Sequence, residues 1–381
     1  MTTLRVVLDQ MTAPVPGGIG RYTEELTRAL IAAAPADCDV EGIVSSSPAE
    51  HCAQIEASLP GLAGLHRTAL PRRELTAAWQ LGIANSSGSG LIHAPSLLAP
   101  LRRHSIVDNG TQVAVTVHDV LAWTHPEALT PATVAWTKVM VKRARKHADA
   151  IVVPSHAVAH QLADIVDLGD RVRVIGGGVG IGLHLPANSS ATEIIGERLG
   201  LPSEYIVAVG TLEPRKAITA LITGLGLPGA PDLPLIVLGP GSWGELDVAS
   251  VADEAGLPFG RVRSMNGLTD EELAVVIARA AVFVYPSLEE GFAGPMIQAF
   301  HLGTPVVHSD APALVEAAGD AGLVVERADA AGYPERLAAA VARALTDTTL
   351  ANRLSIVGAD RARAFTWRDS AEQVWLLHAD L

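Results

Sequence analysis

The segment 209–216, Val-Gly-Thr-Leu-Glu-Pro-Arg-Lys, carries the residues of this chain best suited to hold an anion. Arg215 and Lys216 are adjacent cations at the point where a helix is expected to begin, and cations there oppose the helix dipole. A phosphate bound by both side chains, with help from helix N–H groups, would explain their position. The alternative is a solvated pair of cations beside Glu213. The segment therefore favours a phosphate site.

A second loop, at 286–295, places acidic and amide side chains where a sugar could bind. It contains Glu290 between short, glycine-rich stretches and precedes a helix expected from about Pro295. Gln298 follows Glu290 by eight residues, about two helical turns into that helix. Carboxylate and amide groups suit sugar hydroxyls, which both donate and accept hydrogen bonds. The loop is therefore a candidate sugar site.

The first half of the chain offers two weaker candidates. The segment 17–22, Gly-Gly-Ile-Gly-Arg-Tyr, lies between an expected strand and an expected helix. It lacks the dinucleotide-binding fingerprint because Thr23 stands where the third glycine is required. It fits either a phosphate-facing loop or a tight turn. The pair His118–Asp119 ends a strongly apolar strand, and such a histidine is either functional or satisfied by its own backbone surroundings.

Short apolar runs alternate with longer segments of helical spacing, and these elements must position the loops. The alternation predicts parallel sheets that are covered by helices on both faces. The expected strands lie at 6–8, 114–117, 150–153, 206–209, 235–238, 282–285 and 305–307. The expected helices lie at 21–33, 132–148, 157–165, 217–224, 271–280, 296–302, 311–318 and 367–379.

The 381 residues are too many for one hydrophobic core. Glycines at 176–178 open a stretch without apolar periodicity, so 176–203 is the best candidate for a linker. We therefore expect two doubly wound, Rossmann-like α/β domains, at 1–180 and 200–365, that face a central cleft. Ligands of such sheets bind at the carboxyl ends of the strands.

Composition excludes several classes of protein. The net charge is −13, from 28 basic and 41 acidic residues, and most of the acidic excess lies after residue 180. A nucleic-acid-binding protein needs a basic face, so we expect no nucleic acid as a partner. The two cysteines form no disulfide framework or zinc motif. We see neither a signal peptide nor a membrane span, and expect a cytoplasmic protein.

The segments 17–22, 117–119, 210–216, 290–295 and 302–307, taken together, resemble glycosyltransferase family 4 and its bacterial mannosyltransferase B-like branch. The resemblance covers nearly the whole chain, in order. It implies the GT-B fold and a retaining hexosyltransferase of polysaccharide biosynthesis. The donor would be a GDP- or UDP-linked sugar, with mannose as one candidate. The acceptor would be a glycan, a lipid or a small molecule.

The resemblance also implies a role for each matched position. Lys216, with Arg215, would bind the donor diphosphate, Glu290 would bind hydroxyls of the transferred sugar, and His118 would contact that sugar. His118, Glu290 and Lys216 are the expected catalytic residues. The other donor-binding positions are Gly17, Gly18, Gly210, Thr211, Gly291, Phe292, Ala293, Gly294 and Gln298. The final helix, at 366–381, would pack back on the first domain.

Four positions depart from the family pattern. The usual second glutamate is Gln298, the usual Gly-Arg is Gly210-Thr211, Ala293 is inserted in Gly-Phe-Gly, and Gly180 replaces an aspartate. These departures leave a non-catalytic, nucleotide-sugar-binding partner subunit as the alternative function. An epimerase or a phosphorylase fits less well, because the sequence offers neither an acid/base set beyond His118 and Glu290 nor a spare lysine for pyridoxal phosphate.

Two further features bear on partners. Asp37-Cys38-Asp39 matches an Asp-x-Asp metal motif but lies before a strand, so we interpret it as a turn and expect neither a metal nor a cofactor beyond the nucleotide-sugar co-substrate. The expected helix at 138–147 carries five positive charges. It is either a solvated face or a peripheral contact with the inner membrane face. The oligomeric state stays open.

Overall fold

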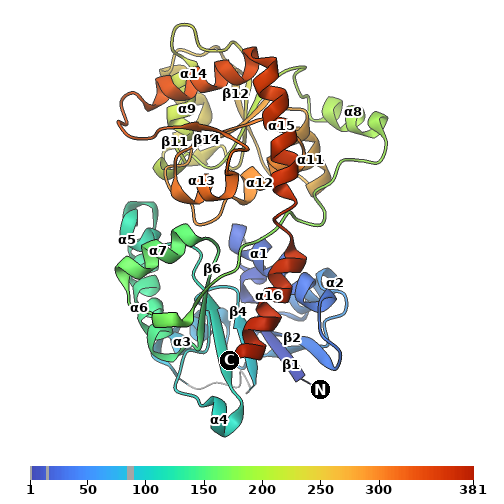
Figure 1. Ribbon diagram of the computed structural model, residues 1–381, viewed down its shortest axis with the longest axis vertical. Coiled ribbons are helices and arrows are strands. Elements are labelled where there is room, and N and C mark those ends of the chain that lie inside the picture. Colours follow the sequence, from blue (N-terminus) through green and yellow to red (C-terminus); the bar gives the residue numbers. More distant parts are fainter. Residues whose placement is uncertain (1, 14–16, 84–89) are drawn as a thin grey trace. The chain divides into compact units, whose positions relative to one another are not determined.

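The chain folds into two compact units in the computed structural model, which describes residues 2–13, 17–83 and 90–381 (Figure 1). Unit 1 comprises the chain up to Gly178 together with Thr366–Leu381. Unit 2 comprises Val179–Phe365. Each unit is built on its own parallel sheet, which confirms the predicted α/β class of two doubly wound domains.

The sheet of unit 1 has seven parallel strands in the order β3-β2-β1-β4-β5-β6-β7. β1 is the point where the strand order reverses, because β2 lies on one side of it and β4 on the other. The strands are β1 Thr2–Val7, β2 Cys38–Val44, β3 Gly64–Arg67, β4 Leu91–Ala94, β5 Gln112–Thr116, β6 Ala150–Val153 and β7 Val172–Val174.

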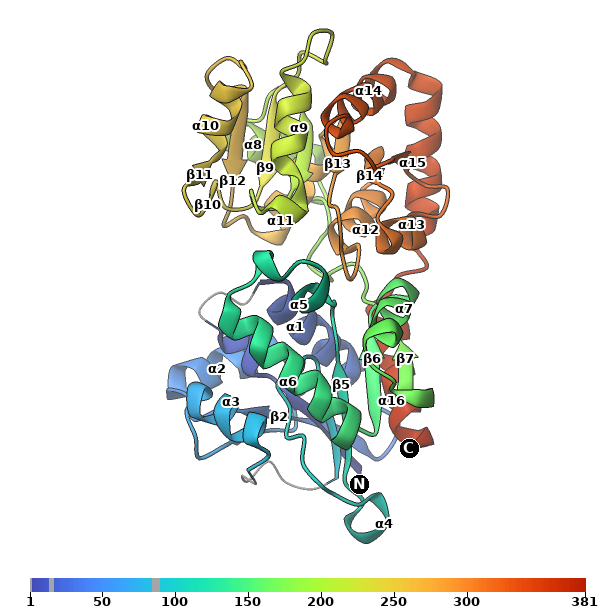
Figure 2. The same ribbon diagram turned by 90° about the vertical axis from the view of Figure 1, so that its left-hand side faces the viewer.

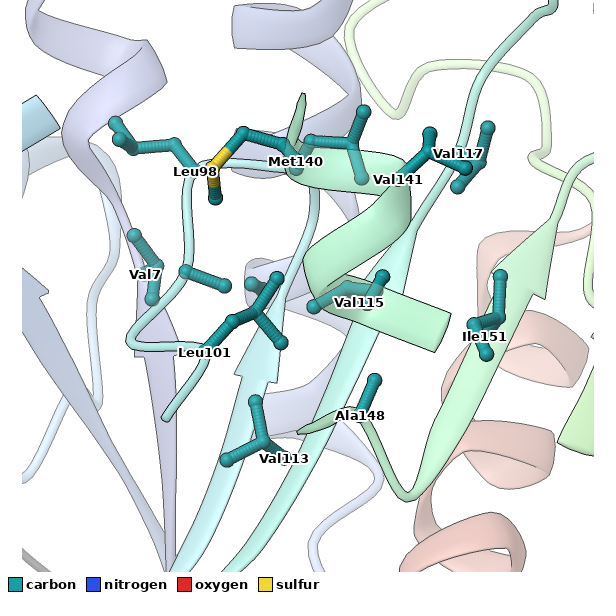
Figure 3. Close-up of a cluster of buried hydrophobic side chains, with 14 of the residues drawn as sticks. Val7, Leu98, Leu101, Val113, Val115, Val117, Met140, Val141, Ala148 and Ile151 are labelled. Carbon is teal, nitrogen blue, oxygen red and sulfur yellow. The ribbon is translucent and has the colours of Figure 1, made fainter. Parts of the chain in front are cut away.

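Helices cover both faces of this sheet because the strand residues alternate between two cores. Val113, Val115 and Ile151 pack against α3, α6 and α7, as Figure 3 shows for α6. Ala114 and Val152 face the core formed with α1, α2 and α16. The helices are α1 Gly17–Ala32, α2 Ala49–Ser58, α3 Arg72–Leu81, α4 Ile106–Asn109, α5 Leu121–Thr124, α6 Pro131–His147, α7 His156–Ile165 and α16 Trp367–Asp380.

The sheet of unit 2 has six parallel strands in the order β12-β9-β8-β13-β14-β15, and its order reverses at β8. Its strands are β8 Ile206–Val209, β9 Leu235–Leu238, β12 Val262–Met265, β13 Val282–Tyr285, β14 Val306–Ser309 and β15 Leu323–Val325, with a small hairpin of β10 Ser242–Trp243 and β11 Leu246–Asp247. Its helices are α8 Ser189–Arg198, α9 Ile218–Leu225, α10 Val248–Glu254, α11 Asp270–Ala278, α12 Gly294–His301, α13 Pro312–Ala318, α14 Tyr333–Thr346 and α15 Thr348–Ala362.

The final helix, α16, belongs to unit 1 although it follows unit 2 in the sequence (Figures 1 and 2). Its face of Ala371, Val374 and Trp375 is buried against α1 and the sheet. The Trp375 indole N–H donates to the Leu30 carbonyl at 3.1 Å, and the Ser370 hydroxyl donates to the Gly176 carbonyl at 2.9 Å.

The segment expected to be a linker, 176–203, differs from the prediction. It contains α8, which packs on α11 inside unit 2. Asn188, within this stretch, caps the helix: its side-chain oxygen accepts from the Ser190 and Ala191 N–H groups. Polar residues at a helix start and in a linker look alike in sequence. Within the described ranges, no helix combines the length and the apolar character needed to cross a membrane.

Candidate functional site

The two loops predicted to hold a phosphate and a sugar lie at the switch point of the unit 2 sheet. β8 and β13 are neighbouring strands, and each loop follows the carboxyl end of one of them. The backbone joins the loops directly, because the Leu288 N–H donates to the Arg215 carbonyl at 2.7 Å. Residues about 75 positions apart in sequence are thus brought together where open α/β sheets bind ligands.

The loop after β8 makes a turn that only certain residues allow. Gly210 has a φ of +153°, a conformation that favours glycine. Pro214–Lys216 form one 3-10 turn, and Ala217 then adopts the left-handed conformation, with a φ of +50°. α9 begins only at Ile218, so the two cations precede the helix rather than open it as predicted. Left-handed backbone at a non-glycine residue is strained, and such strain concentrates at functional sites.

Lys216, Arg215 and Glu290 form one ion-pair cluster. The Lys216 ammonium lies 2.6 Å from Glu290 Oε1, and Arg215 Nη1 lies 3.3 Å from Glu290 Oε2. The side chains of Arg215 and Glu290 are only 10% and 9% exposed, whereas that of Lys216 is 18% exposed. A poorly hydrated ion pair is held more tightly than one on the surface, so the cluster is a rigid feature of the site.

Glu290 is ionised in this cluster. Burial by itself would raise the pKa of its carboxyl group, but the charges of Lys216 and Arg215 outweigh burial and lower the pKa below the ordinary value. An ionised carboxylate only accepts hydrogen bonds, so Glu290 is suited to receive the O–H groups of a sugar.

Arg215 and Lys216 are not equivalent. Arg215 also bonds Glu213 at 2.9 Å and the Glu289 carbonyl at 2.8 Å, so its guanidinium mainly fastens the two loops to each other. Lys216 pairs with Glu290 and lies 5.9 Å from the centre of the Tyr285 ring. Of the two predicted phosphate ligands, Lys216 therefore has more capacity left for a ligand.

The remaining predicted donor residues lie at the start of α12. Ala293 is buried, Gly291 and Phe292 are half-buried, and Gly294 is the first residue of the helix. Gln298 is half-buried in the second turn. The structure thus brings Gly210, Thr211, Arg215, Lys216 and 290–298 into one region of unit 2.

Two supports of this region had not been found in the sequence. The Ser309 hydroxyl, at the end of β14, donates to the Ser287 carbonyl and accepts from the Ala311 N–H at 3.2 Å. Arg327, after β15, bonds Asp310 at 3.1 Å and donates to the Leu288 carbonyl. Ser309 ends one strand and Arg327 follows the next, and a position at the carboxyl end of a strand is the signal that could have identified them.

In unit 1, His118 lies just past the end of β5 and is half-buried. Its Nε2 lies 2.7 Å from the Pro95 carbonyl, and its ring meets Tyr22 edge-on at 4.7 Å. A carbonyl can only accept, so Nε2 carries the proton. Burial lowers the pKa of His118, although the Pro95 bond and Asp119 oppose this effect. His118 is therefore a neutral imidazole whose Nδ1 can accept a hydrogen bond.

The two predicted glycines of unit 1, Gly17 and Gly18, differ in what their backbone requires. Gly17 has a φ of +57° and starts α1, so its backbone requires glycine, whereas Gly18 has an ordinary φ and open space where a Cβ would lie.

Asp37 and Asp39 lie at the amino end of β2, the sheet edge opposite that of His118. Across the described ranges of the chain, no group of three His, Cys, Asp or Glu side chains could hold a metal ion.

Comparison with known proteins adds to this geometry. The family described as "Glycosyltransferase Family 4" matches residues 16–181, and "Glycosyl transferases group 1" matches 203–347. The chain is 28% identical to O-antigen chain mannosyltransferase B of Escherichia coli over 378 residues, which cover 93% of this chain and 94% of that protein.

Solved structures show the same fold over the full length. Sucrose-phosphate synthase of Thermosynechococcus elongatus superposes with a TM-score of 0.75 at 23% identity, covering 100% of this chain and 99% of its own. The Anabaena protein HepE, in complex with UDP and glucose, gives 0.74 at 18% identity, with 100% of both chains covered. With both halves matched in order and one relative matched end to end, this chain belongs to glycosyltransferase family 4 and is a hexosyltransferase of the GT-B fold.

Proposed function

We propose that this protein is a retaining mannosyltransferase that takes its donor, a nucleoside diphosphate sugar, at the switch point of unit 2 and extends a saccharide acceptor. The observation that carries the proposal is the buried cluster of Lys216, Arg215 and Glu290, which places a cation and a hydroxyl acceptor side by side. The full-length relative named for mannosyl transfer to an O-antigen chain supports both the sugar and the class of acceptor.

The proposed reaction breaks the bond between the anomeric carbon and the diphosphate oxygen. A new bond forms between that carbon and an acceptor hydroxyl oxygen, and the hydroxyl proton passes to the departing diphosphate. Negative charge builds up on that diphosphate, so a preorganised cation beside it gives the largest stabilisation. Lys216 supplies this cation, while Glu290 accepts hydroxyls of the transferred sugar.

Retention follows in this proposal from attack on the face that the diphosphate leaves. Glu290 is ion-paired to Lys216 at 2.6 Å, which suits hydroxyl binding better than nucleophilic attack. The anomeric configuration of the product, observed directly by NMR before it equilibrates, tests this step: an inverted product would contradict it.

A panel of nucleotide sugars tests the function itself. Purified protein is incubated with GDP-mannose, UDP-glucose and related donors, with and without a saccharide acceptor, and release of nucleoside diphosphate is measured. We expect GDP-mannose to give acceptor-dependent release. Binding of a donor without turnover of any member of the panel would instead support the non-catalytic alternative.

Independence from metal is part of the proposal, because Lys216 and Arg215 supply the positive charge at the diphosphate. We expect full activity in excess chelator. Loss of activity that returns with added Mg²⁺ or Mn²⁺ would overturn this part alone.

Gln298 is expected to set the strength of nucleotide binding. A charged acceptor bonds ribose hydroxyls more strongly than a neutral amide, by about 1 kcal/mol for each bond. Gln298→Glu is therefore expected to tighten nucleoside diphosphate binding about five-fold in calorimetric titration, with GDP and UDP tested separately. Gln298→Ala, which removes the polar group, serves as the opposite control and should weaken binding. Unchanged affinity in both variants would remove Gln298 from the ribose site.

We also propose that the protein attaches peripherally to the inner membrane face through 138–147. Lys142, Arg145 and Lys146 are exposed on α6, and Val139, also exposed, lies on the same side of the helix as Lys142 and Lys146. Neighbouring segments add exposed aliphatic side chains. Leu81 is 70% exposed at the end of α3, next to a glycine that abuts Arg143 of α6.

Leu101, whose carbonyl accepts from Arg143 of α6, begins a segment that leads to Val107, which is 95% exposed. Basic side chains with flanking aliphatic groups are the composition that anionic lipid surfaces attract.

Sedimentation with vesicles tests the attachment. Each lysine near an anionic surface contributes about 1 kcal/mol, so Lys142→Glu with Lys146→Glu should lower partitioning to phosphatidylglycerol-containing vesicles at least ten-fold. Arg353→Glu with Arg363→Glu makes the same charge change on exposed residues of unit 2 and should have little effect. Equal losses in the two double variants would show a net-charge effect and no specific surface.

A further inference from the structure

A pocket of about 540 Å³ lies in unit 1 between α1 and α2. Gly17, Gly20, Arg21 and Glu24 of α1 line one wall, and residues of α2 line the other. None of the donor-binding residues of unit 2 takes part in it, and neither does His118. Its size accommodates more than a few waters, so it is large enough for a small organic ligand.

The lining of this pocket suits an uncharged, hydroxyl-rich ligand. Ile55, 3% exposed, and Met11 form an apolar surface, beside which stand the exposed side chains of His51 and Gln54. The wall also carries Arg21, which can donate to sugar hydroxyls, and Glu24, which can accept from them although it is also bonded to Arg28 at 2.6 Å. Apolar patches beside amide and imidazole groups match the ring faces and hydroxyls of a sugar.

The position of α1 links the pocket to His118. Tyr22 lies on the same helix and meets the His118 ring at 4.7 Å, whereas Gly20, Arg21 and Glu24 point to the pocket. These residues occupy opposite sides of α1 because successive residues turn by 100°. His118 and the pocket are therefore separated by about the width of one helix, roughly 10 Å.

That separation determines what kind of acceptor could contact both His118 and the pocket. A single sugar ring at His118 does not reach around α1, but a short chain of sugars does. Gly17 and Gly18, both exposed, place no side chain at the start of the helix, where such a chain would pass. Gly17 has open space where a Cβ would lie.

We propose that the pocket between α1 and α2 binds a neutral sugar unit of the acceptor, remote from the hydroxyl that receives the new sugar. This inference rests on the proposed function. The enzyme then prefers acceptors of three or more sugar units to single sugars, because only the longer chains fill the pocket. His51 and Gln54 are the residues that determine this preference.

Acceptor length tests the proposal. We measure kcat/KM with methyl α-mannoside and with an α-linked mannotetraose, for the wild type and for the double variant His51→Ala with Gln54→Ala. Both side chains are exposed, so the double variant should fold. Glu56→Ala, on an exposed part of α2 outside the pocket, is the matched control.

We expect the wild type to prefer the tetrasaccharide at least ten-fold, and the double variant to lose most of that preference with little change for the monosaccharide. Two lost hydrogen bonds account for a decrease of this size. The control should keep the full preference. Equal losses for both acceptors, or an unchanged ratio, would overturn the proposal.

A binding experiment separates this inference from the proposed function. Saturation-transfer NMR detects binding of the mannotetraose to the protein in the absence of donor. A signal that the double variant lacks and the control retains supports the pocket even if no donor is turned over. A signal that persists unchanged in the double variant overturns it. Transfer to the tetrasaccharide with no dependence on His51 and Gln54 would leave the transferase assignment intact and remove the pocket from it.

Discussion

Lys216→Ala is expected to lower kcat about 10²–10³-fold while nucleoside diphosphate affinity falls far less. The physical reason is that the ammonium acts mainly on charge that appears as the diphosphate leaves. Removing one preorganised donor at such a position typically costs about 3–4 kcal/mol in the transition state. Steady-state kinetics with saturating donor give kcat, and calorimetry with the nucleoside diphosphate gives the affinity.

The partner of Lys216 complicates the interpretation of this variant. Without the ammonium, Glu290 keeps only Arg215, at 3.3 Å, as its charged partner. The pKa of its carboxyl group would then rise, because burial opposes ionisation and part of the compensating charge is gone. A loss of activity could therefore come from a protonated Glu290.

A double-mutant cycle separates the two causes. Lys216→Ala, Glu290→Gln and the combined variant are compared, with Lys142→Ala on the exposed face of α6 as the control for loss of one lysine. If Lys216 served only to neutralise Glu290, the combined variant would be no worse than Glu290→Gln alone. We expect it to be much worse. Equal losses of kcat and of nucleotide affinity in Lys216→Ala would contradict a transition-state role.

Much of the fold could be predicted because apolar residues dominate the strands. In β5, Val113 and Val115 face one core and Ala114 faces the other, so each strand is apolar on both faces and stands out in the sequence. The loops that follow β8 and β13 were found by the same logic. Strand order was not accessible from the pattern, yet it is what makes these two loops neighbours.

The inner arrangement of the site could not be predicted, because it depends on contacts distant in sequence. Arg215 and Lys216 look alike as neighbouring cations, but the first is committed to Glu213 and to the Glu289 carbonyl. The left-handed Ala217, which delays the start of α9, carries no compositional signal, since such backbone is usually marked by glycine. Ser309, at the end of β14, and Arg327, after β15, support the sugar loop, and sequence periodicity does not give the strand order that places them beside it.

A buried pair of histidines in unit 1 lay outside the sequence predictions altogether. His93 is in β4 and His378 is in α16, and their ring centres are 5.7 Å apart. His378 bonds the Gln112 side chain at 3.2 Å, while neither ring nitrogen of His93 has a partner among the described residues. Burial lowers the pKa of His93 to about 3 and that of His378 to about 4, in the first case with help from the other ring. Both are therefore neutral in the folded protein at ordinary pH.

Acidification is expected to destabilise unit 1 through this pair. Both rings have an ordinary pKa of 6.5 when unfolded, so between pH 6.5 and 4 the unfolded chain binds more protons than the folded chain. The free energy of unfolding should then fall by up to about 1.4 kcal/mol for each pH unit and each histidine. The contribution is fully present above pH 6.5 and decreases as the pH is lowered.

The variant His378→Gln isolates one half of this effect, because glutamine can still bond Gln112 but does not titrate. We expect a shallower fall in stability between pH 6.5 and 4, by roughly 3 kcal/mol over the whole interval. Urea unfolding, monitored by tryptophan fluorescence at each pH, measures this difference in the free energy of unfolding. The signal reports on unit 1, since five of the six tryptophans lie there and two of those are in α16. His160→Gln, on an exposed part of α7, is the matched control and should keep the wild-type slope. The same slope in His378→Gln as in the wild type would show that α16 does not couple proton uptake to the stability of unit 1.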